Sequence, residues 1–227
     1  QFDGSQITTA PPIYTQRLTH WQYRSSVKYV FEKYFNNVGD LLPPDSSTGA
    51  IPSNENYDLP TNDYARYAKA AAHVAVEIMA QDEEKLDALF DCPGARNRSC
   101  AKAFIKARGA HLFRRPLSNA EANAFLEIYD VGAQGTFAEG IQFVIEALLQ
   151  APDFLYQIEL SPADASGDVR LSGLEIATRL AFFLHAKPPT QELLDAAVAG
   201  ELDDDAGVAA WVDTLLADVG AARFGIQ

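Results

Sequence analysis

The segment at residues 136–152, TFAEGIQFVIEALLQAP, carries the clearest structural signal in the chain. A hydroxyl at Thr136, followed three residues later by Glu139, is the capping-box pattern that begins a helix. Pro152 ends the pattern, because proline restricts the residue before it to extended backbone. The segment therefore predicts a core helix with one continuous apolar stripe: Phe137, Ile141, Val144, Ile145 and Leu148.

The same signals recur on both sides of this segment. Two further capping boxes start at Ser118 and at Ser172. No segment alternates between apolar and polar residues over the length of a strand. We therefore expect an all-α protein, an irregular bundle of about nine helices with long loops. Besides the helix above, the expected helices cover about 19–36, 62–81, 82–90, 99–115, 174–185 and 191–199, and two more begin after Ser118 and after Asp205.

Polar and proline-rich stretches suggest how the chain is organised. We expect an extended N-terminal segment at 1–16, a helical subdomain at 17–160 and a second helical subdomain at 161–227. The second is expected to be truncated, because Phe224 and Ile226 resemble the opening of another buried segment. The helix at 174–185 is apolar nearly all round and is expected to lie deep in the core. The loop at 37–60 is long enough to suggest a function, but we favour a surface connection packed through Leu41, Leu42 and Ile51.

Charge and hydropathy limit the classes of partner. The 227 residues carry a formal net charge of −13, which repels a phosphate backbone and makes nucleic acid a poor partner. No apolar run reaches the roughly 20 residues that a membrane-spanning helix needs. The partner that we expect is therefore the remainder of the same polypeptide or another protein chain.

The two cysteines, Cys92 and Cys100, lie close together in the sequence. Pro93 and Gly94 between them can turn the chain, so the spacing favours a small disulfide loop. A disulfide implies an oxidising compartment, and we expect an extracytoplasmic location: periplasmic, outer-surface or secreted. A reduced pair, or half of a metal site, is the alternative. Zinc is disfavoured, because no second cysteine pair and no suitably spaced histidine accompanies the first.

Sequence motifs of catalysis and cofactor binding are missing. No two of the four histidines share a helix face, and there is no Cys-x-x-Cys-His, Gly-x-Ser-x-Gly or glycine-rich phosphate loop. We therefore expect neither a metal site nor a cofactor within this chain. The sequence assigns no catalytic residue and leaves open whether the chain is an enzyme. The histidines are expected to be structural: His20, His73, His111 and His185.

The stretch FRRPLS at residues 113–118 is the most distinctive one in the chain. Arg114 and Arg115 follow an apolar helix end, and together they could clamp an acidic group, which makes them a candidate anion-binding pair. They could equally bond the last carbonyls of the preceding helix and pair with neighbouring acids. We favour this structural role.

Five short motifs carry a family resemblance. They are RLTHWQY at 17–23, YAKAA at 67–71, AHLFRRPLS at 110–118, LQAPDFLY at 149–156 and EIATRLAFFL at 175–184. In this order they resemble a family of secreted bacterial domains of unknown function, found behind planctomycete-type cytochrome c domains. The resemblance implies an extracytoplasmic protein linked to redox chemistry. Any haem would belong to an associated domain or chain, and no catalytic residue carries over.

Three hypotheses for function follow. The favoured one is a secreted helical scaffold or interaction domain of a larger extracytoplasmic protein, to which the resemblance adds a cytochrome link. The second is part of an enzyme that acts on extracellular polymers or their fragments. Its site would lie in a cleft between this segment and the missing part of the polypeptide, with the loop at 37–60, Arg114 and Arg115 as candidates. The third is a structural subunit of a surface assembly.

Overall fold

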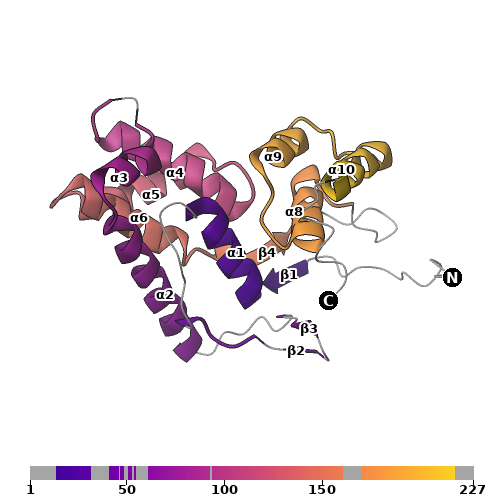
Figure 1. Ribbon diagram of the computed structural model, residues 1–227, viewed down its shortest axis with the longest axis horizontal. Helices are drawn as coiled ribbons and strands as arrows, with labels where there is room; N and C mark the ends of the chain where they lie inside the picture. The colour runs from indigo at the N-terminus through magenta and orange to yellow at the C-terminus, as the bar shows by residue number, and fades with distance from the viewer. Residues whose placement is uncertain are drawn as a thin grey trace.

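The computed structural model describes residues 14–31, 41–45, 47–48, 51–52, 54, 61–92, 94–160 and 170–217. Within these residues the chain forms ten helices and two small antiparallel sheets (Figure 1). The prediction of an all-α bundle of about nine helices is confirmed. The unexpected helix is the single turn α7 (Pro152–Leu155). Proline is well tolerated there, because the first helical position has no backbone partner to lose.

A first hydrophobic cluster fills the space between the helices before residue 156. The apolar stripe predicted for α6 lies in it, with Ile141, Val144, Ile145 and Leu148 all 0 % exposed. Helix α6 packs against α2, α4 and α5. The helices of this part are α1 (His20–Phe31), α2 (Thr61–Met79), α3 (Glu83–Phe90), α4 (Arg98–Phe113), α5 (Asn119–Gly132), α6 (Phe137–Leu148) and α7.

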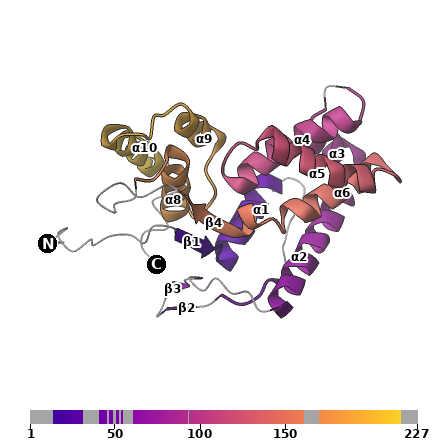
Figure 2. The ribbon, with the colours of Figure 1, turned by 180° about the vertical axis from the view of Figure 1, so that it is seen from behind.

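A second, smaller cluster lies among α8 (Gly173–His185), α9 (Gln191–Val198) and α10 (Asp205–Ala217). Seen from either side, these helices stand apart from the others, with β1 (Tyr14–Arg17) and β4 (Tyr156–Glu159) between the two groups (Figures 1 and 2). The division into subdomains stays a prediction, because Phe182 of α8 belongs to the first cluster.

The expectation that the helix at 174–185 lies deep in the core is wrong. Helix α8 packs between the two clusters: Ala177 and Ala181 face the second, whereas Phe182 enters the first. The neighbouring Phe183 is 85 % exposed. When apolar residues lie on all sides of a helix, the sequence does not show which side stays exposed, and here that side carries Phe183.

The two sheets were not predicted. Strand β1 pairs with β4, so that Gln16 lies opposite Gln157, and β2 (Ser47–Thr48) pairs with β3 (Ile51–Pro52). In β4 the burial alternates, but Gln157 and Glu159 point inward while Ile158 is 36 % exposed. The residues of β4 do alternate between apolar and polar, but only over four positions, which is too short to distinguish a strand, and the inward residues are the polar ones.

Some sequence predictions fall outside the described residues. Leu41 and Leu42 of the loop at 37–60 pack against the first cluster, as expected. Phe224, Ile226 and residues 1–13 lie outside the described part of the chain. None of the helices in the described part has both the length and the apolar character needed to span a bilayer.

The predicted disulfide between Cys92 and Cys100 is confirmed, with 5.5 Å between the two Cα atoms. The short loop that it closes is also held by Arg96. Its guanidinium donates to Glu83 (2.7 Å) and Asp87 (2.6 Å) of α3 and lies 5.0 Å from the centre of the Phe90 ring. The loop is therefore fixed to α3 by covalent and polar contacts together.

Reduction of this disulfide is expected to lower the free energy of unfolding by about 2–3 kcal/mol, because opening a short loop returns chain entropy to the unfolded state. Urea unfolding with and without reductant measures the difference. The Cys92→Ser/Cys100→Ser double variant is the control and should not respond to reductant. Equal stability of the oxidised and reduced wild-type chains would contradict the prediction.

Candidate functional site

A cavity of about 220 Å³ lies between β4 and the N-terminal half of α8, where the two helix groups meet. Arg114 and Arg115, the pair that the sequence singles out, line one side. Ser172, Glu175 and Thr178 of α8 line the other. Residues from both groups therefore meet at this cavity.

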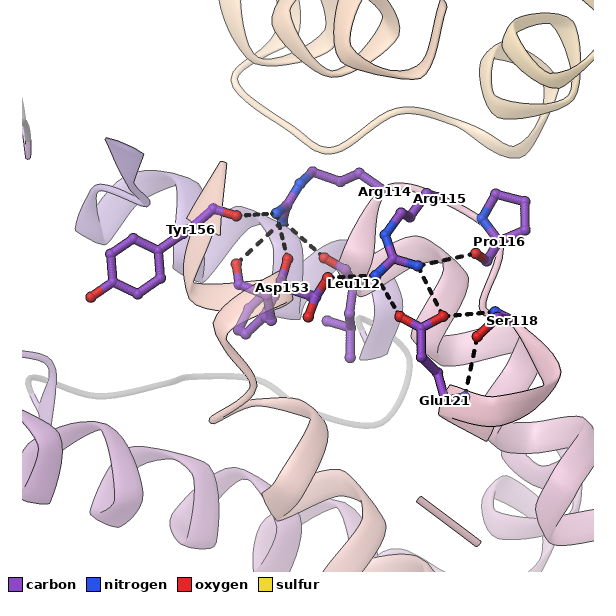
Figure 3. A network of polar contacts seen from close by, with 9 residues as sticks. Leu112, Arg114, Arg115, Pro116, Ser118, Glu121, Asp153 and Tyr156 are labelled. Carbon is purple, nitrogen blue, oxygen red and sulfur yellow. Dashed lines mark hydrogen bonds and ion pairs between the residues drawn. The ribbon is translucent and has the colours of Figure 1, made fainter. Parts of the chain in front are cut away.

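Arg114 is a buried cation whose hydrogen bonds go to the backbone. Its side chain lies in the interior, with the residue only 4 % exposed. One terminal nitrogen donates to the carbonyls of Leu112 (2.9 Å) and Phe154 (3.3 Å). The other donates to those of Asp153 (2.7 Å) and Tyr156 (2.7 Å), as Figure 3 shows. These carbonyls belong to helix ends, where the backbone lacks partners within the helix. Arg114 thus joins the end of α4 to α7 and β4.

The position of Arg114 at the end of α4 explains the direction of its side chain and its lowered pKa. The residue caps α4 in the left-handed conformation, with φ 59°, which turns the chain at the helix end. Burial lowers the pKa of Arg114 to about 10, partly offset by the nearby Asp153. The group is therefore still charged at neutral pH. Its guanidinium carbon also lies 6.0 Å from the centre of the Phe182 ring of α8, a cation–π distance.

Arg115 forms ion pairs with two carboxylates. Its terminal nitrogens reach Glu121 at 2.6 Å and 3.2 Å and Asp153 at 2.5 Å (Figure 3). Glu121 also accepts a hydrogen bond from the backbone of Ser118 (2.8 Å) in the capping box of α5. Arg115 therefore connects the start of α5 to α7.

The charge of Glu121 makes stability depend on pH. The hydrogen bond from Arg115, with help from Ser118, lowers the pKa of Glu121 from 4.5 to about 2. Because the folded carboxyl keeps its charge to lower pH than the unfolded one, its contribution is complete above about pH 4.5 and is lost as the pH falls to about 2.

Glu121→Gln is therefore expected to destabilise the protein at pH 6, and the difference from wild type should shrink as the pH falls toward 2. Thermal melts at several pH values measure it. In an Arg115→Met background, the same substitution should lose most of this pH dependence. A wild-type-to-variant difference that is constant with pH would contradict the ion-pair origin.

Both arginines make the contacts of the structural alternative. Arg114 bonds a carbonyl of the preceding helix, and Arg115 pairs with neighbouring acids. An incoming anion would have to compete with Glu121 and Asp153 for Arg115. Anion binding by the pair stays a prediction, and calorimetric titration with phosphate would test it.

The sequence did not identify the ion pair that fastens α8 to β4. Glu159 is 6 % exposed and accepts two hydrogen bonds from Arg179, at 2.6 Å and 2.7 Å. The backbone N–H of Leu160 also donates to Glu175 at 2.6 Å. The strand and the helix are separated by the polar link at 161–169, so no local spacing could have revealed the contact.

A second buried arginine was also missed. Arg17, at 6 % exposure, donates to the Tyr67 hydroxyl (2.7 Å) and to the Asn54 side chain (3.0 Å). It opens the RLTHWQY motif, but its partners come from distant parts of the chain. Like Arg114, it joins separate segments of the first helix group.

The histidines contact the surrounding protein. His20 contacts the Pro43 carbonyl, and His185 lies 3.0 Å from the Leu215 carbonyl. His111 packs edge-on against Tyr29, with ring centres 5.6 Å apart, and burial lowers its pKa. Among the described residues, no group of three or more His, Cys, Asp or Glu side chains is arranged to hold a metal ion.

Comparison with known families finds two matches. Residues 100–159 match the model of PSD5, described as a protein of unknown function (DUF1595). Residues 171–226 match that of PSD4, described as a protein of unknown function (DUF1592). No curated protein and no solved structure matches the chain. The first match runs from α4 through β4 and the second begins at the cap of α8, so the cavity lies where the two matched segments meet.

Proposed function

We propose that this chain, which matches two adjoining families of unknown function, is a helical scaffold domain of a larger extracytoplasmic protein. The observation that carries the proposal is the use of Arg114. All of its hydrogen bonds within the described residues go to the backbone of the protein itself. Arg115 is likewise held by two carboxylates of the same chain. Because these two arginines bond to groups of the protein itself, they support a structural role rather than a catalytic one.

The proposed location rests on the disulfide. A bond between Cys92 and Cys100 forms and persists in oxidising compartments such as the periplasm or the cell exterior. The cytochrome link rests on the sequence resemblance alone. If it holds, the haem is carried by an associated domain or chain.

Helix α10 supplies the surface proposed for the partner. Although α10 reads DAGVAAWVDTLLA, Leu215 is its only buried residue among those described. Val208 and Trp211 of α10 are partly buried against the second cluster, whereas Leu216 is 52 % exposed. An apolar helix with so little of its surface covered is typical of an interface. We propose that the rest of the polypeptide, or a partner chain, covers it.

A photo-crosslinking amino acid at position 216 of the full-length protein, expressed in its natural host, tests this proposal. The matched control position is Val131 of α5, which is 59 % exposed. We expect position 216 to crosslink to one defined segment or chain and position 131 not to do so. Equal labelling at the two positions would refute the proposed interface.

The two other hypotheses give different outcomes in companion experiments. An enzyme that uses this cavity should lose turnover in Arg115→Ala at temperatures where circular dichroism shows that the variant is still folded. A subunit of a surface assembly should form large particles whose light scattering rises with protein concentration. Either result would replace the scaffold proposal.

A further inference from the structure

A second, more open groove shares Gln157 and Glu159 with the cavity described above and has Arg179 in its lining as well. It has a volume of about 670 Å³ and runs between the β1–β4 ribbon and the C-terminal half of α8. These elements lie together at the junction of the two helix groups (Figures 1 and 2). The volume is within the range of about 300–1,000 Å³ that is typical of small-molecule sites. Its lining combines carboxamides, one ion pair and aromatic rings, and it includes neither Arg114 nor Arg115.

Three glutamine side chains from three elements converge on this groove: Gln16 of β1, Gln22 of α1 and Gln157 of β4. Gln157 is 8 % exposed, yet its carboxamide makes no hydrogen bond to any residue that the structure describes. Gln22 accepts a bond from the Thr19 backbone (2.9 Å), while its NH₂ group has no acceptor within the described part of the chain. Neither carboxamide is among the fully buried unpaired polar atoms of the described residues, so both reach the solvent of the groove and can hydrogen-bond to a ligand there.

An aromatic face borders these amides. Phe183 lines the groove and is 85 % exposed, whereas the adjacent Phe182 is only 8 % exposed and anchors α8 in the first cluster. The anchored neighbour fixes the helix that carries Phe183. The exposed ring therefore offers a positioned apolar surface at a polar groove.

The charges of the groove favour an uncharged ligand. Its carboxylate, Glu159, and its guanidinium, Arg179, neutralise each other through two parallel hydrogen bonds. A carboxamide both donates and accepts hydrogen bonds, as does a sugar hydroxyl. An extended peptide would instead be bound through main-chain hydrogen bonds to a strand edge, and here the polar groups are side-chain amides.

We propose that this groove binds a neutral saccharide. One sugar ring stacks on Phe183, and its hydroxyl groups hydrogen-bond to the carboxamides of Gln157 and Gln22. The proposal does not depend on the scaffold function, because it uses neither the α10 surface nor the arginine network.

The test uses the whole 227-residue chain and an array of neutral and acidic oligosaccharides of three to six units, followed by calorimetric titration with the best neutral binder. We expect saturable binding of neutral oligosaccharides. Phe183→Ala and Gln157→Met should each raise the Kd about tenfold or more, the size of a lost aromatic contact or hydrogen bond. Because Phe183 is 85 % exposed, its replacement should leave the melting temperature unchanged, which separates lost binding from lost folding.

The matched control is Phe143→Ala, since Phe143 of α6 is 42 % exposed and does not line the groove. Its Kd should stay within about twofold of wild type. The proposal is overturned if no neutral oligosaccharide binds, if acidic ones bind more tightly, or if Phe183→Ala binds as well as wild type. Selective binding of an extended peptide in the groove would also overturn it, in favour of a peptide site.

Discussion

Replacement of Arg114 by alanine is expected to lower the free energy of unfolding by about 3–5 kcal/mol. The substitution removes the donors that serve the carbonyls of Leu112, Asp153, Phe154 and Tyr156. The bonds to the carbonyls of Leu112 and Phe154 are buried, and these carbonyls lose partners that water cannot easily replace. Since small proteins are stable by only about 5–15 kcal/mol, the variant should be close to unfolding. Urea denaturation followed by circular dichroism measures the loss.

Three further variants identify the cause of this loss. Arg114→Lys keeps the charge but lacks the planar fork, and should recover only part of the stability. Arg114→Gly relieves the left-handed backbone at φ 59° and should still be strongly destabilised. Arg98→Ala breaks an exposed ion pair with Asp130 and should cost less than about 1 kcal/mol. If Arg114→Ala cost no more than Arg98→Ala, the structural role of Arg114 would be refuted.

Replacement of Phe154 by alanine is expected to have a comparable effect, about 3–5 kcal/mol. Phe154 is 0 % exposed, and its ring centre lies 4.9 Å from that of Tyr23 of α1. Deleting the ring opens a cavity between α1 and α7, and the surrounding helices cannot easily move in to fill it. Scanning calorimetry should show a large fall in the melting temperature.

The matched control is again Phe143→Ala, which removes the same group at 42 % exposure and should cost much less. Phe154 also supplies a carbonyl to Arg114. Effects of neighbouring residues are not additive, so Phe154→Ala and Arg114→Ala together should cost less than the sum of the two. Equal losses for Phe154→Ala and Phe143→Ala would show that burial at position 154 does not matter.

The sequence predicted the features that depend on local spacing. The stripe of α6 follows from residues three and four positions apart. Four of its residues are buried and Phe137 is partly buried; the four are Ile141, Val144, Ile145 and Leu148. The disulfide joins cysteines separated by one short turn. In both cases the feature is set by residues within one short stretch of the chain, so the pattern itself reveals it.

Features that depend on distant partners were not decided by the sequence. The sequence marked Arg114 as distinctive but could not choose between an anion and the backbone, because the carbonyls of Asp153 and Tyr156 lie 39 and 42 positions away. Strand β4 was not predicted because it is only four residues long, and its inward residues, Gln157 and Glu159, are polar. These polar residues are inward because the β1–β4 ribbon faces another helix group and not an apolar core.

The pairing of β1 with β4 has a consequence for biosynthesis. Gln16 leaves the ribosome long before Gln157, its partner in the ribbon, has been translated. At typical rates of about 5–20 residues per second, β1 waits on the order of ten seconds with its hydrogen-bonding edge unsatisfied. During that interval the unpaired strand β1 can pair with other polypeptide chains. Completion of this region is therefore a late event, and a chaperone that shields β1 should raise the yield of folded protein.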